Sequence, residues 1–257
     1  MPSRWWIPLP DARPDRVRLE HIHAAISRWF DPDTAAHNAP VKRYAISPLA
    51  SDSEGELGCE IAVLERAASA PPEAEGTLTP DPLDQLRQHT RPGSNIRLGT
   101  DRVSVGAPRR IAGEAWESLG TPSGARSWEL EFVTPVTFRR RDRSSPLPTP
   151  PTLLRGLLDS WNYCSSLPAR EVDRSTHDLI WVSDIAGASE PMKLSGFTVS
   201  GFTGRVTYRC DDAAVADIID GLFRLAPYSG CGSARAKGLG VTRLTIPDRR
   251  RSSRTTR

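Results

Sequence analysis

The sequence predicts an α+β fold in which one small unit of strands and helices occurs twice. In the first half the predicted elements follow approximately the order strand, helix, strand, strand, helix, strand, and this order recurs in the second half. A stretch rich in glycine and serine, GTPSGARS, separates the halves as a linker. This order defines the ferredoxin-like fold, which RNA-recognition modules share. We therefore expect two tandem ferredoxin-like (RRM-like) domains over residues 1–122 and 127–247, followed by a basic tail over residues 248–257 that we expect to be flexible.

The clearest element of the first half is a helix over residues 17–30. Leu19, Ile22 and Ile26 recur there at helical spacing and form one apolar stripe. The polar stretch DPDTAAHNAP, residues 31–40, is predicted to be a loop. The other predicted elements are a short apolar segment at 5–10, strands at 42–50 and 58–66, a helix at 81–90, and strands within 96–113.

The second half repeats this order. Residues 149–164 are predicted to form a helix with Thr152 as its N-cap. Residues 211–227 are predicted to form another helix, whose first residues are aspartates that complement the helix dipole. The predicted strands are 127–139, 177–187, 197–210 and 240–246.

Composition indicates an ordinary soluble chain. Of its 257 residues, 38% are hydrophobic and 25% are charged. We find no apolar run long enough to span a membrane and no pattern typical of a secretion signal, so we expect a cytoplasmic protein without a membrane partner. The four cysteines form no close pair, so the spacings typical of zinc sites are absent and four free thiols are expected.

The net charge of +3 is unevenly distributed. The last eleven residues, 247–257, hold five arginines and one aspartate, a contribution of +4 that leaves −1 for the rest of the chain. A second basic cluster, FRRRDRSSPLPTPP, follows the first strand of the second half. Local basic patches on a nearly neutral body are typical of proteins that hold a polyanion at particular places. An arginine-rich tail can equally be a solubilising end.

A glycine-rich, basic loop, YSGCGSARAKGLGV, lies between the last helix and the last strand. It is neither a Walker loop nor a dinucleotide fingerprint, because both of those motifs follow a strand and open a helix. Glycines let the backbone approach a ligand closely, and successive amides can form an anion-binding nest, although such loops are often plain turns. The candidate phosphate-binding residues are Gly230, Gly232, Arg235, Lys237, Gly238 and Gly240 here, and Arg139, Arg140 and Arg141 in the basic cluster.

Three segments together resemble a known family. YSGCGSARAKGLGVTRL resembles the C-terminal glycine-rich motif of the RAMP superfamily of CRISPR-associated proteins. GFTVSGFTGRVTYRC is similar to a segment of the repeat-processing endoribonucleases within that superfamily. HIHAAISRWF and AAHNAPVKRYAISPL are similar to the same family's N-terminal helix, histidine-containing loop and strand. The resemblance covers both ends of the chain and the order of elements, but little of the middle.

The resemblance implies two tandem ferredoxin-like domains and a defined reaction. Such proteins bind the repeat of a CRISPR precursor RNA and cut it once without a metal or cofactor. The 2′-hydroxyl attacks the adjacent phosphate, which leaves a 2′,3′-cyclic phosphate and a 5′-hydroxyl. The expected partners are CRISPR repeat RNA and, further on, a CRISPR effector complex, with the chain acting as a monomer or homodimer.

This reaction needs a base, an acid and a positive charge, and the chain offers candidates for these roles. His37 lies in the loop where the family places its histidine, and imidazole suits proton transfer near neutral pH. Lys42 is the expected cation, with Arg43 as its competitor. His21, about 200° round the helix from Leu19 at roughly 100° per residue, faces away from the apolar stripe and is the expected second histidine. His23 is expected to be packed, and the general base stays unassigned.

Two other readings remain open. The chain can be a non-catalytic RAMP subunit that binds CRISPR RNA within an effector complex, which does not require His37. It can also be a ferredoxin-like binding module unrelated to CRISPR. Trp5, Trp6 and Trp29 are candidates for base stacking, although tryptophan is more often buried.

Overall fold

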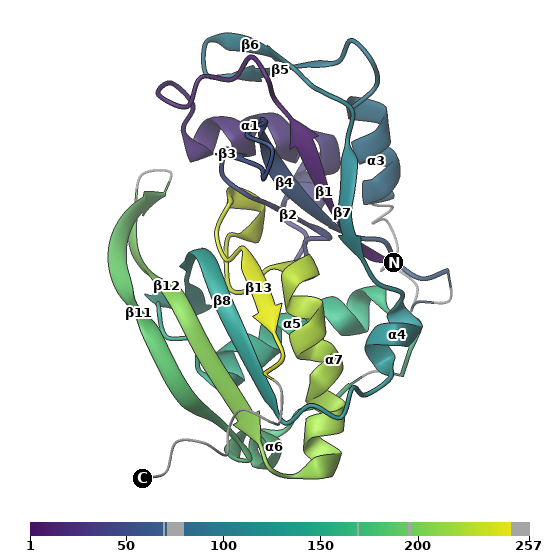
Figure 1. Cartoon of the computed structure of the whole chain (residues 1–257), viewed down its shortest axis with the longest axis vertical. Helices are drawn as coiled ribbons and strands as arrows, with labels where there is room; N and C mark the ends of the chain where they lie inside the picture. The colour runs from purple at the N-terminus through teal and green to yellow at the C-terminus, as the bar shows by residue number, and fades with distance from the viewer. Residues whose placement is uncertain (69, 71–79, 169, 195–196, 248–257) are drawn as a thin grey trace.

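The structure, a computed structural model, describes residues 1–68, 70, 80–168, 170–194 and 197–247. Two antiparallel four-stranded arrangements dominate it, one in each half of the chain (Figure 1). The basic tail over residues 248–257 lies outside the described residues, so the expectations for it stay predictions.

The N-terminal sheet has the strand order β2-β4-β1-β7, with β3 as an addition that pairs with β4. This is the ferredoxin-like arrangement, in which the first and third strands lie side by side at the centre. Its strands are β1 (Pro2–Pro8), β2 (Tyr44–Ile46), β3 (Ala50–Ser51), β4 (Leu57–Leu64) and β7 (Arg109–Gly113). A small hairpin of β5 (Asn95–Leu98) and β6 (Asp101–Ser104) precedes β7.

Helices α1 (Leu19–Phe30) and α3 (Pro82–His89) join this sheet in one hydrophobic core. The apolar stripe predicted for α1 is confirmed, since Ile22, Ile26 and Trp29 are buried. The predicted loop over 31–40 instead contains a one-turn helix, α2 (Thr34–His37), because the Asp33 side chain accepts a hydrogen bond from the Ala36 amide and caps it. His37 is the last residue of this turn.

The C-terminal sheet has the order β11-β12-β8-β13, which is the same ferredoxin-like arrangement. Its strands are β8 (Ser127–Val136), β11 (Ile180–Leu194), β12 (Phe197–Cys210) and β13 (Thr242–Thr245), with a separate hairpin of β9 (Phe138–Arg140) and β10 (Arg143–Ser145). The helices are α4 (Trp116–Gly120), α5 (Pro150–Cys164), α6 (Arg174–Asp178) and α7 (Ala213–Ser229), and a 3₁₀ turn, η1 (Arg235–Lys237), lies in the glycine-rich loop.

Alternation along β8 fixes which face of this sheet is covered. Trp128, Leu130 and Phe132 are fully buried, as expected for every second residue of a strand that packs on helices. Trp128 stacks on Phe223 of α7 with ring centroids 4.8 Å apart, and its indole donates a 2.8 Å hydrogen bond to buried Asp220. The C-terminal core is therefore built around α5 and α7.

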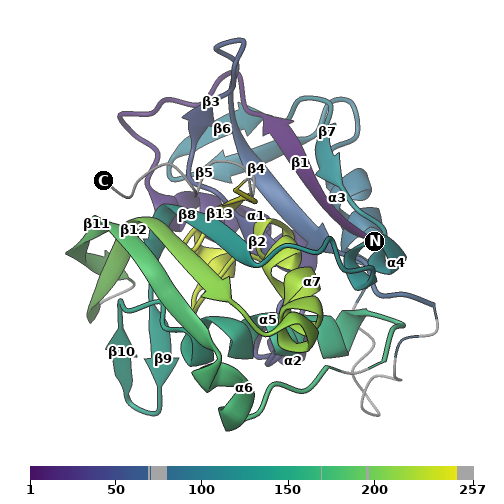
Figure 2. The same cartoon turned by 60° about the horizontal axis from the view of Figure 1, so that its bottom comes forward.

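Helix α7 also carries the contact between the two halves, since it packs against β4 and β1 as well as β13. Leu64 of β4 and Trp116 of α4 belong to the C-terminal hydrophobic cluster, although both lie in the first half of the chain. Helix α4 lies beside α7 (Figures 1 and 2). Tandem ferredoxin-like domains are thus confirmed, whereas the exact domain bounds stay a prediction.

Three smaller findings complete the fold. Helix α5 begins at Pro150 with Thr149 as its N-cap, because two prolines occupy its first turn, so the predicted N-cap Thr152 lies one turn too late. The four cysteines are free and buried. Within the described residues, no helix has the length and apolar character needed to cross a membrane.

Candidate active site and nucleic-acid interface

A groove of about 1150 Å³ lies where the two halves meet. Its walls come from the segment after α1, the glycine-rich loop, the start of β9, α5 and α6. It brings together His23, His37 and Lys42 of the first half with Lys237 and Arg155 of the second half. Four aspartates share the lining: Asp31, Asp159, Asp173 and Asp178. A groove with cations and imidazoles from both halves can hold a phosphodiester and move protons on it.

Asp31 is the centre of the first cluster in this groove. Its Oδ2 accepts hydrogen bonds from Lys42 Nζ at 2.8 Å and from the Tyr44 hydroxyl at 2.7 Å. His37 Nδ1 lies 3.4 Å from the same oxygen. The Asp31 side chain is 5% exposed, whereas the His37 side chain is 56% exposed. A buried carboxylate therefore holds three cationic or proton-carrying groups, of which His37 and Lys42 line the groove.

His23 forms the second imidazole of the groove. Its Nδ1 lies 2.9 Å from the Ala236 carbonyl oxygen of the glycine-rich loop. A carbonyl oxygen only accepts, so Nδ1 carries the proton and Nε2 keeps its lone pair in the neutral ring. Burial lowers the pKa of His23 below its usual value; the bond to the Ala236 carbonyl oxygen partly opposes this, and the charge of Lys237 adds to the lowering. His23 is therefore a neutral imidazole near pH 7 with a free basic nitrogen.

His21, the expected second histidine, lies elsewhere. Its Nδ1 accepts a hydrogen bond from the Arg18 amide at the start of α1, and its ring contacts Gly99 in the turn between β5 and β6. It is not among the residues that line the groove. The physical reason is that the glycine-rich loop packs on the side of α1 near the apolar stripe, which brings His23 and not His21 towards the phosphate-binding region.

The glycine-rich loop is a tightly packed structural element. Gly240 has φ +66°, and a Cβ there would lie 1.8 Å from the Cys231 carbonyl oxygen. Gly238 has φ +86°, and a Cβ there would lie 2.2 Å from Leu19 of α1. Gly230 and Gly232 also have positive φ. The glycines are thus required by the backbone path and by the contact with α1.

The two cations of this loop differ in their surroundings. Arg235 Nη1 donates to the Ser160 hydroxyl and the Ser229 carbonyl oxygen, both at 3.0 Å, and burial lowers its pKa. These bonds tie the loop to α5 and to the end of α7, so Arg235 acts as an anchor with little freedom to follow RNA. Lys237 lines the groove close to His23 and is the better placed of the two for a phosphate.

The basic cluster meets the groove only in part. Arg139 is exposed and lines it, with its backbone amide donating to the Ser233 hydroxyl of the glycine-rich loop. Arg141 is exposed in the turn between β9 and β10, where its φ is +58°. The side chain of Arg140 lies outside the description. Their expected contacts with RNA stay predictions.

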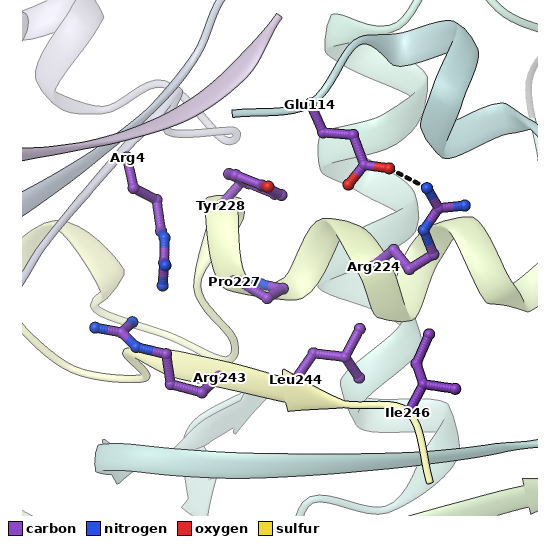
Figure 3. A pocket seen from close by; sticks show the side chains of 8 residues that line it. All are labelled: Arg4, Glu114, Arg224, Pro227, Tyr228, Arg243, Leu244 and Ile246. Atoms are coloured by element: carbon purple, nitrogen blue, oxygen red, sulfur yellow. Dashed lines mark hydrogen bonds and ion pairs between the residues drawn. The ribbon is translucent and has the colours of Figure 1, made fainter. Parts of the chain in front are cut away.

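A second hollow, of about 320 Å³, lies between β1, β13 and α7. Figure 3 shows Arg4 and Arg243 extending into it from the two sheets, while Glu114 pairs with Arg224 at its other side. Arg243 Nη2 donates to Glu60 Oε2 at 2.6 Å, and Arg4 Nη1 lies 3.6 Å from Glu60 Oε1. Within the part of the chain that the structure describes, the buried Nε and Nη1 of Arg4 lack hydrogen-bond partners. One carboxylate thus holds two arginines at the junction of the sheets.

The tryptophans considered for base stacking are largely packed. Trp6 and Trp29 are 7% and 4% exposed, and Trp29 stacks on His89 with ring centroids 5.3 Å apart. Trp5 is half-buried, and its indole donates to the Ser3 hydroxyl. Burial leaves Trp6 and Trp29 little surface for a nucleobase.

Sequence reasoning missed His23 and Asp31 as groove residues. His23 was assigned to the core because it lies about 40° from the apolar stripe at roughly 100° per residue. The stripe in fact ends at a surface that the glycine-rich loop of the other half covers. Asp31 had one usable signal, since an acidic residue directly after a helix opposes the helix dipole and needs a specific reason to be there.

Comparisons with known proteins bear on the family and on the fold of the chain. The family of the CRISPR-associated endoribonuclease Cas6 matches residues 130–242, which span most of the C-terminal half. The comparison with curated proteins gave no match.

Among solved structures, a Cas6 product complex is 21% identical with a TM-score of 0.74, over 95% of this chain and 100% of the other. Cas6 from Thermus thermophilus is 22% identical with a TM-score of 0.64, over 95% of this chain and 98% of the other. A Cas6-related protein from Pyrococcus furiosus is 10% identical with a TM-score of 0.55, over 96% and 100%.

These structures share the fold of nearly the whole chain, and the family match is in the half that carries the glycine-rich loop. The predicted resemblance is therefore confirmed: residues 130–242 match the Cas6 endoribonuclease family, and nearly the whole chain has the fold of solved Cas6 structures.

Proposed function

We propose that this protein is a metal-independent endoribonuclease that binds the repeat of CRISPR precursor RNA and cuts it once in the groove between its two halves. The observation that carries this proposal is the convergence of His23, His37 and Lys42 in one groove that the glycine-rich loop also lines. The family match to an endoribonuclease and the product complex of a structural relative support RNA as the substrate.

The proposed reaction is an internal transfer at one phosphate. A base removes the proton of the 2′-hydroxyl, and the 2′-oxygen forms a bond to phosphorus. The bond from phosphorus to the 5′-oxygen breaks, and an acid protonates that oxygen as it leaves. The products are a 2′,3′-cyclic phosphate and a 5′-hydroxyl, so atoms and charge balance with one proton taken up and one released.

Two differently placed imidazoles suit these two roles. His23 has a lowered pKa and a free Nε2 lone pair, which are properties of a general base near neutral pH. His37 faces a carboxylate through Nδ1, and its exposed ring can present an Nε2 proton to the leaving oxygen. We therefore assign His23 as base and His37 as acid, and His23 takes the place first expected for His21.

Lys42 supplies positive charge to the phosphorane. Its ammonium has three protons, two of which bond to Asp31 Oδ2 and to the Ala36 carbonyl oxygen at 2.6 Å. The third can meet a phosphate oxygen. Its competitor Arg43 donates a hydrogen bond to the Pro80 carbonyl oxygen, and its side chain is not among those that line the groove. Lys42 is therefore the cation we assign to the transition state.

RNA beyond the cut site would follow the cations that line the groove. Lys237, Arg155 and Arg139 come from three different elements, η1, α5 and β9, so they can contact successive phosphates. Delivery of the product to an effector complex, the choice between monomer and homodimer, and a cytoplasmic location stay predictions.

The proposal is tested by incubating a cognate repeat RNA with the protein in EDTA, beside His37→Ala. Wild-type cutting to a cyclic-phosphate end, reduced about a hundredfold or more in the variant, is the expected result. Tight binding of the repeat without cutting by the wild type would favour the non-catalytic RAMP subunit. Equal affinity for repeat and unrelated RNA would favour a general binding module.

A further inference from the structure

We propose that Asp31 is a positioning residue that sets the tautomer of His37 and fixes the ammonium of Lys42. The inference rests on the proposed function for its catalytic consequence, but its structural part stands on the contacts of Asp31 alone.

Asp31 stands where the helix itself disfavours it. It is the C-cap of α1, and its backbone amide bonds to the Ser27 carbonyl oxygen at 2.7 Å. The negative end of the helix dipole lies there, so a carboxylate at this position is destabilised by the helix. A buried residue whose charge is unfavourable for its own helix is expected to have a role in the site that it faces.

The contacts of Asp31 show what it can do. Lys42 Nζ, Tyr44 OH and His37 Nδ1 all approach the single oxygen Oδ2, at 2.8, 2.7 and 3.4 Å. An ionised carboxylate accepts hydrogen bonds and cannot donate them. The three neighbours must therefore all present protons to it. The ammonium of Lys42 and the hydroxyl of Tyr44 each carry a proton to donate. His37 can donate from Nδ1 only in its Nδ1–H tautomer or as the imidazolium.

This constraint determines which nitrogen of His37 meets the substrate. With Nδ1–H held towards Asp31, proton transfer takes place at Nε2, before and after the 5′-oxygen leaves. Asp31 is the carboxylate that the structure places against His37 Nδ1, whereas Lys42 and Lys237 in the same groove are donors and cannot take its place. Burial of Tyr44 and its bond to Asp31 raise the pKa of the Tyr44 hydroxyl, so it stays a neutral donor.

The variant that tests this is Asp31→Asn, with Asp33→Asn as its matched control. Both variants remove one negative charge in the same loop. Asparagine is as good an N-cap as aspartate, so Asp33→Asn keeps the bond to the Ala36 amide and touches neither His37 nor Lys42. In Asp31→Asn, Lys42 and Tyr44 hold the amide oxygen at the position of Oδ2. His37 Nδ1 then faces a neutral amide oxygen, which is a weaker acceptor than a carboxylate.

Two measurements are made on the full chain. First, nitrogen NMR of the ¹⁵N-histidine-labelled protein without RNA reports the His37 tautomer. The wild type and Asp33→Asn are expected to show Nδ1–H, and Asp31→Asn a larger share of the Nε2–H form, because the charge that favours Nδ1–H is gone. Second, the rate of single-turnover cleavage by Asp31→Asn is expected to fall about a hundredfold, while its affinity for RNA stays within about threefold of the wild type. The double variant Asp31→Asn, His37→Ala is expected to cleave no more slowly than His37→Ala alone.

The outcomes separate the two proposals. An unchanged His37 tautomer in Asp31→Asn, or wild-type cleavage by that variant while His37→Ala is inactive, overturns the role of Asp31 and leaves the endoribonuclease intact. Multiplicative losses in the double variant also overturn it, because Asp31 would then act independently of His37. If the wild type cuts no repeat RNA, the proposed function fails, while the tautomer measurement still decides the role of Asp31.

Discussion

Replacing Gly240 by alanine should destabilise the protein more than any conformational cost of a positive φ can explain. Gly240 has φ +66°, and the new Cβ would lie 1.8 Å from the Cys231 carbonyl oxygen. That oxygen belongs to backbone that is itself fixed, since the Cys231 amide bonds to the Gly240 carbonyl oxygen at 2.9 Å. The clash therefore cannot be relieved by rotating a side chain.

Gly55 gives the matched control. It has φ +82°, and a Cβ there meets no atom within 4 Å. Gly55→Ala should thus cost only the left-handed conformation, about 1–2 kcal/mol. Gly240→Ala should cost that amount plus the displacement of backbone in a packed loop, about 3 kcal/mol or more in total.

Thermal unfolding followed by circular dichroism measures both variants. At about 2–4 °C per kcal/mol for a chain of this size, Gly55→Ala should lower Tm by about 2–8 °C and Gly240→Ala by about 6 °C or more, with the larger loss always in Gly240→Ala. Equal losses in the two variants would refute the reasoning, because the contact with Cys231 would then have no cost.

Three further predictions concern single side chains. Lys237→Ala should weaken repeat binding and reduce the slope of log affinity against log salt concentration by about one. An unchanged slope in a filter-binding titration would show that Lys237 contacts no phosphate. The pKa of His23 is lower in the folded protein than its usual value near 6.5, so the unfolded chain binds the proton more tightly. The free energy of unfolding should therefore fall as pH drops below about 6.5. Urea unfolding of His23→Asn should show a smaller fall than the wild type, and an identical fall would contradict this. Glu60→Gln leaves Arg4 and Arg243 facing each other without a carboxylate. It should lower the free energy of unfolding, measured in urea, by about 2 kcal/mol. A neutral or stabilising change would contradict the role given to Glu60.

The fold was largely predictable because its signals are local. The stripe of Ile22 and Ile26 and the alternation of Trp128, Leu130 and Phe132 determine which faces are buried, and these periods are visible in the sequence. The one-turn helix that carries His37 was missed, because a single turn has no period and depends on one capping bond from Asp33.

The site was only partly predictable because it is assembled from both halves. His37 and Lys42 were expected to lie together because of the family resemblance, and the structure places both in the groove. His23 could not be assigned from the sequence, since its role depends on the Ala236 carbonyl oxygen more than two hundred positions away. For Arg235 the charge suggested a contact with phosphate, which stays a prediction, whereas its bonds to Ser160 and Ser229 could not be read from the sequence. Contacts between distant segments decide these roles, and no local pattern encodes them.

The most direct test of the acid and base assignment uses a repeat RNA with sulfur in place of the bridging 5′-oxygen at the cut site. A thiolate leaves without a proton, so the general acid becomes dispensable while the base does not. We predict that His37→Asn cuts the normal RNA poorly and regains near wild-type rates on the sulfur RNA, whereas His23→Asn, which keeps a donor for the Ala236 carbonyl oxygen, stays slow on both. Equal losses of His37→Asn on the two substrates, or recovery of His23→Asn on the sulfur RNA, would contradict the account.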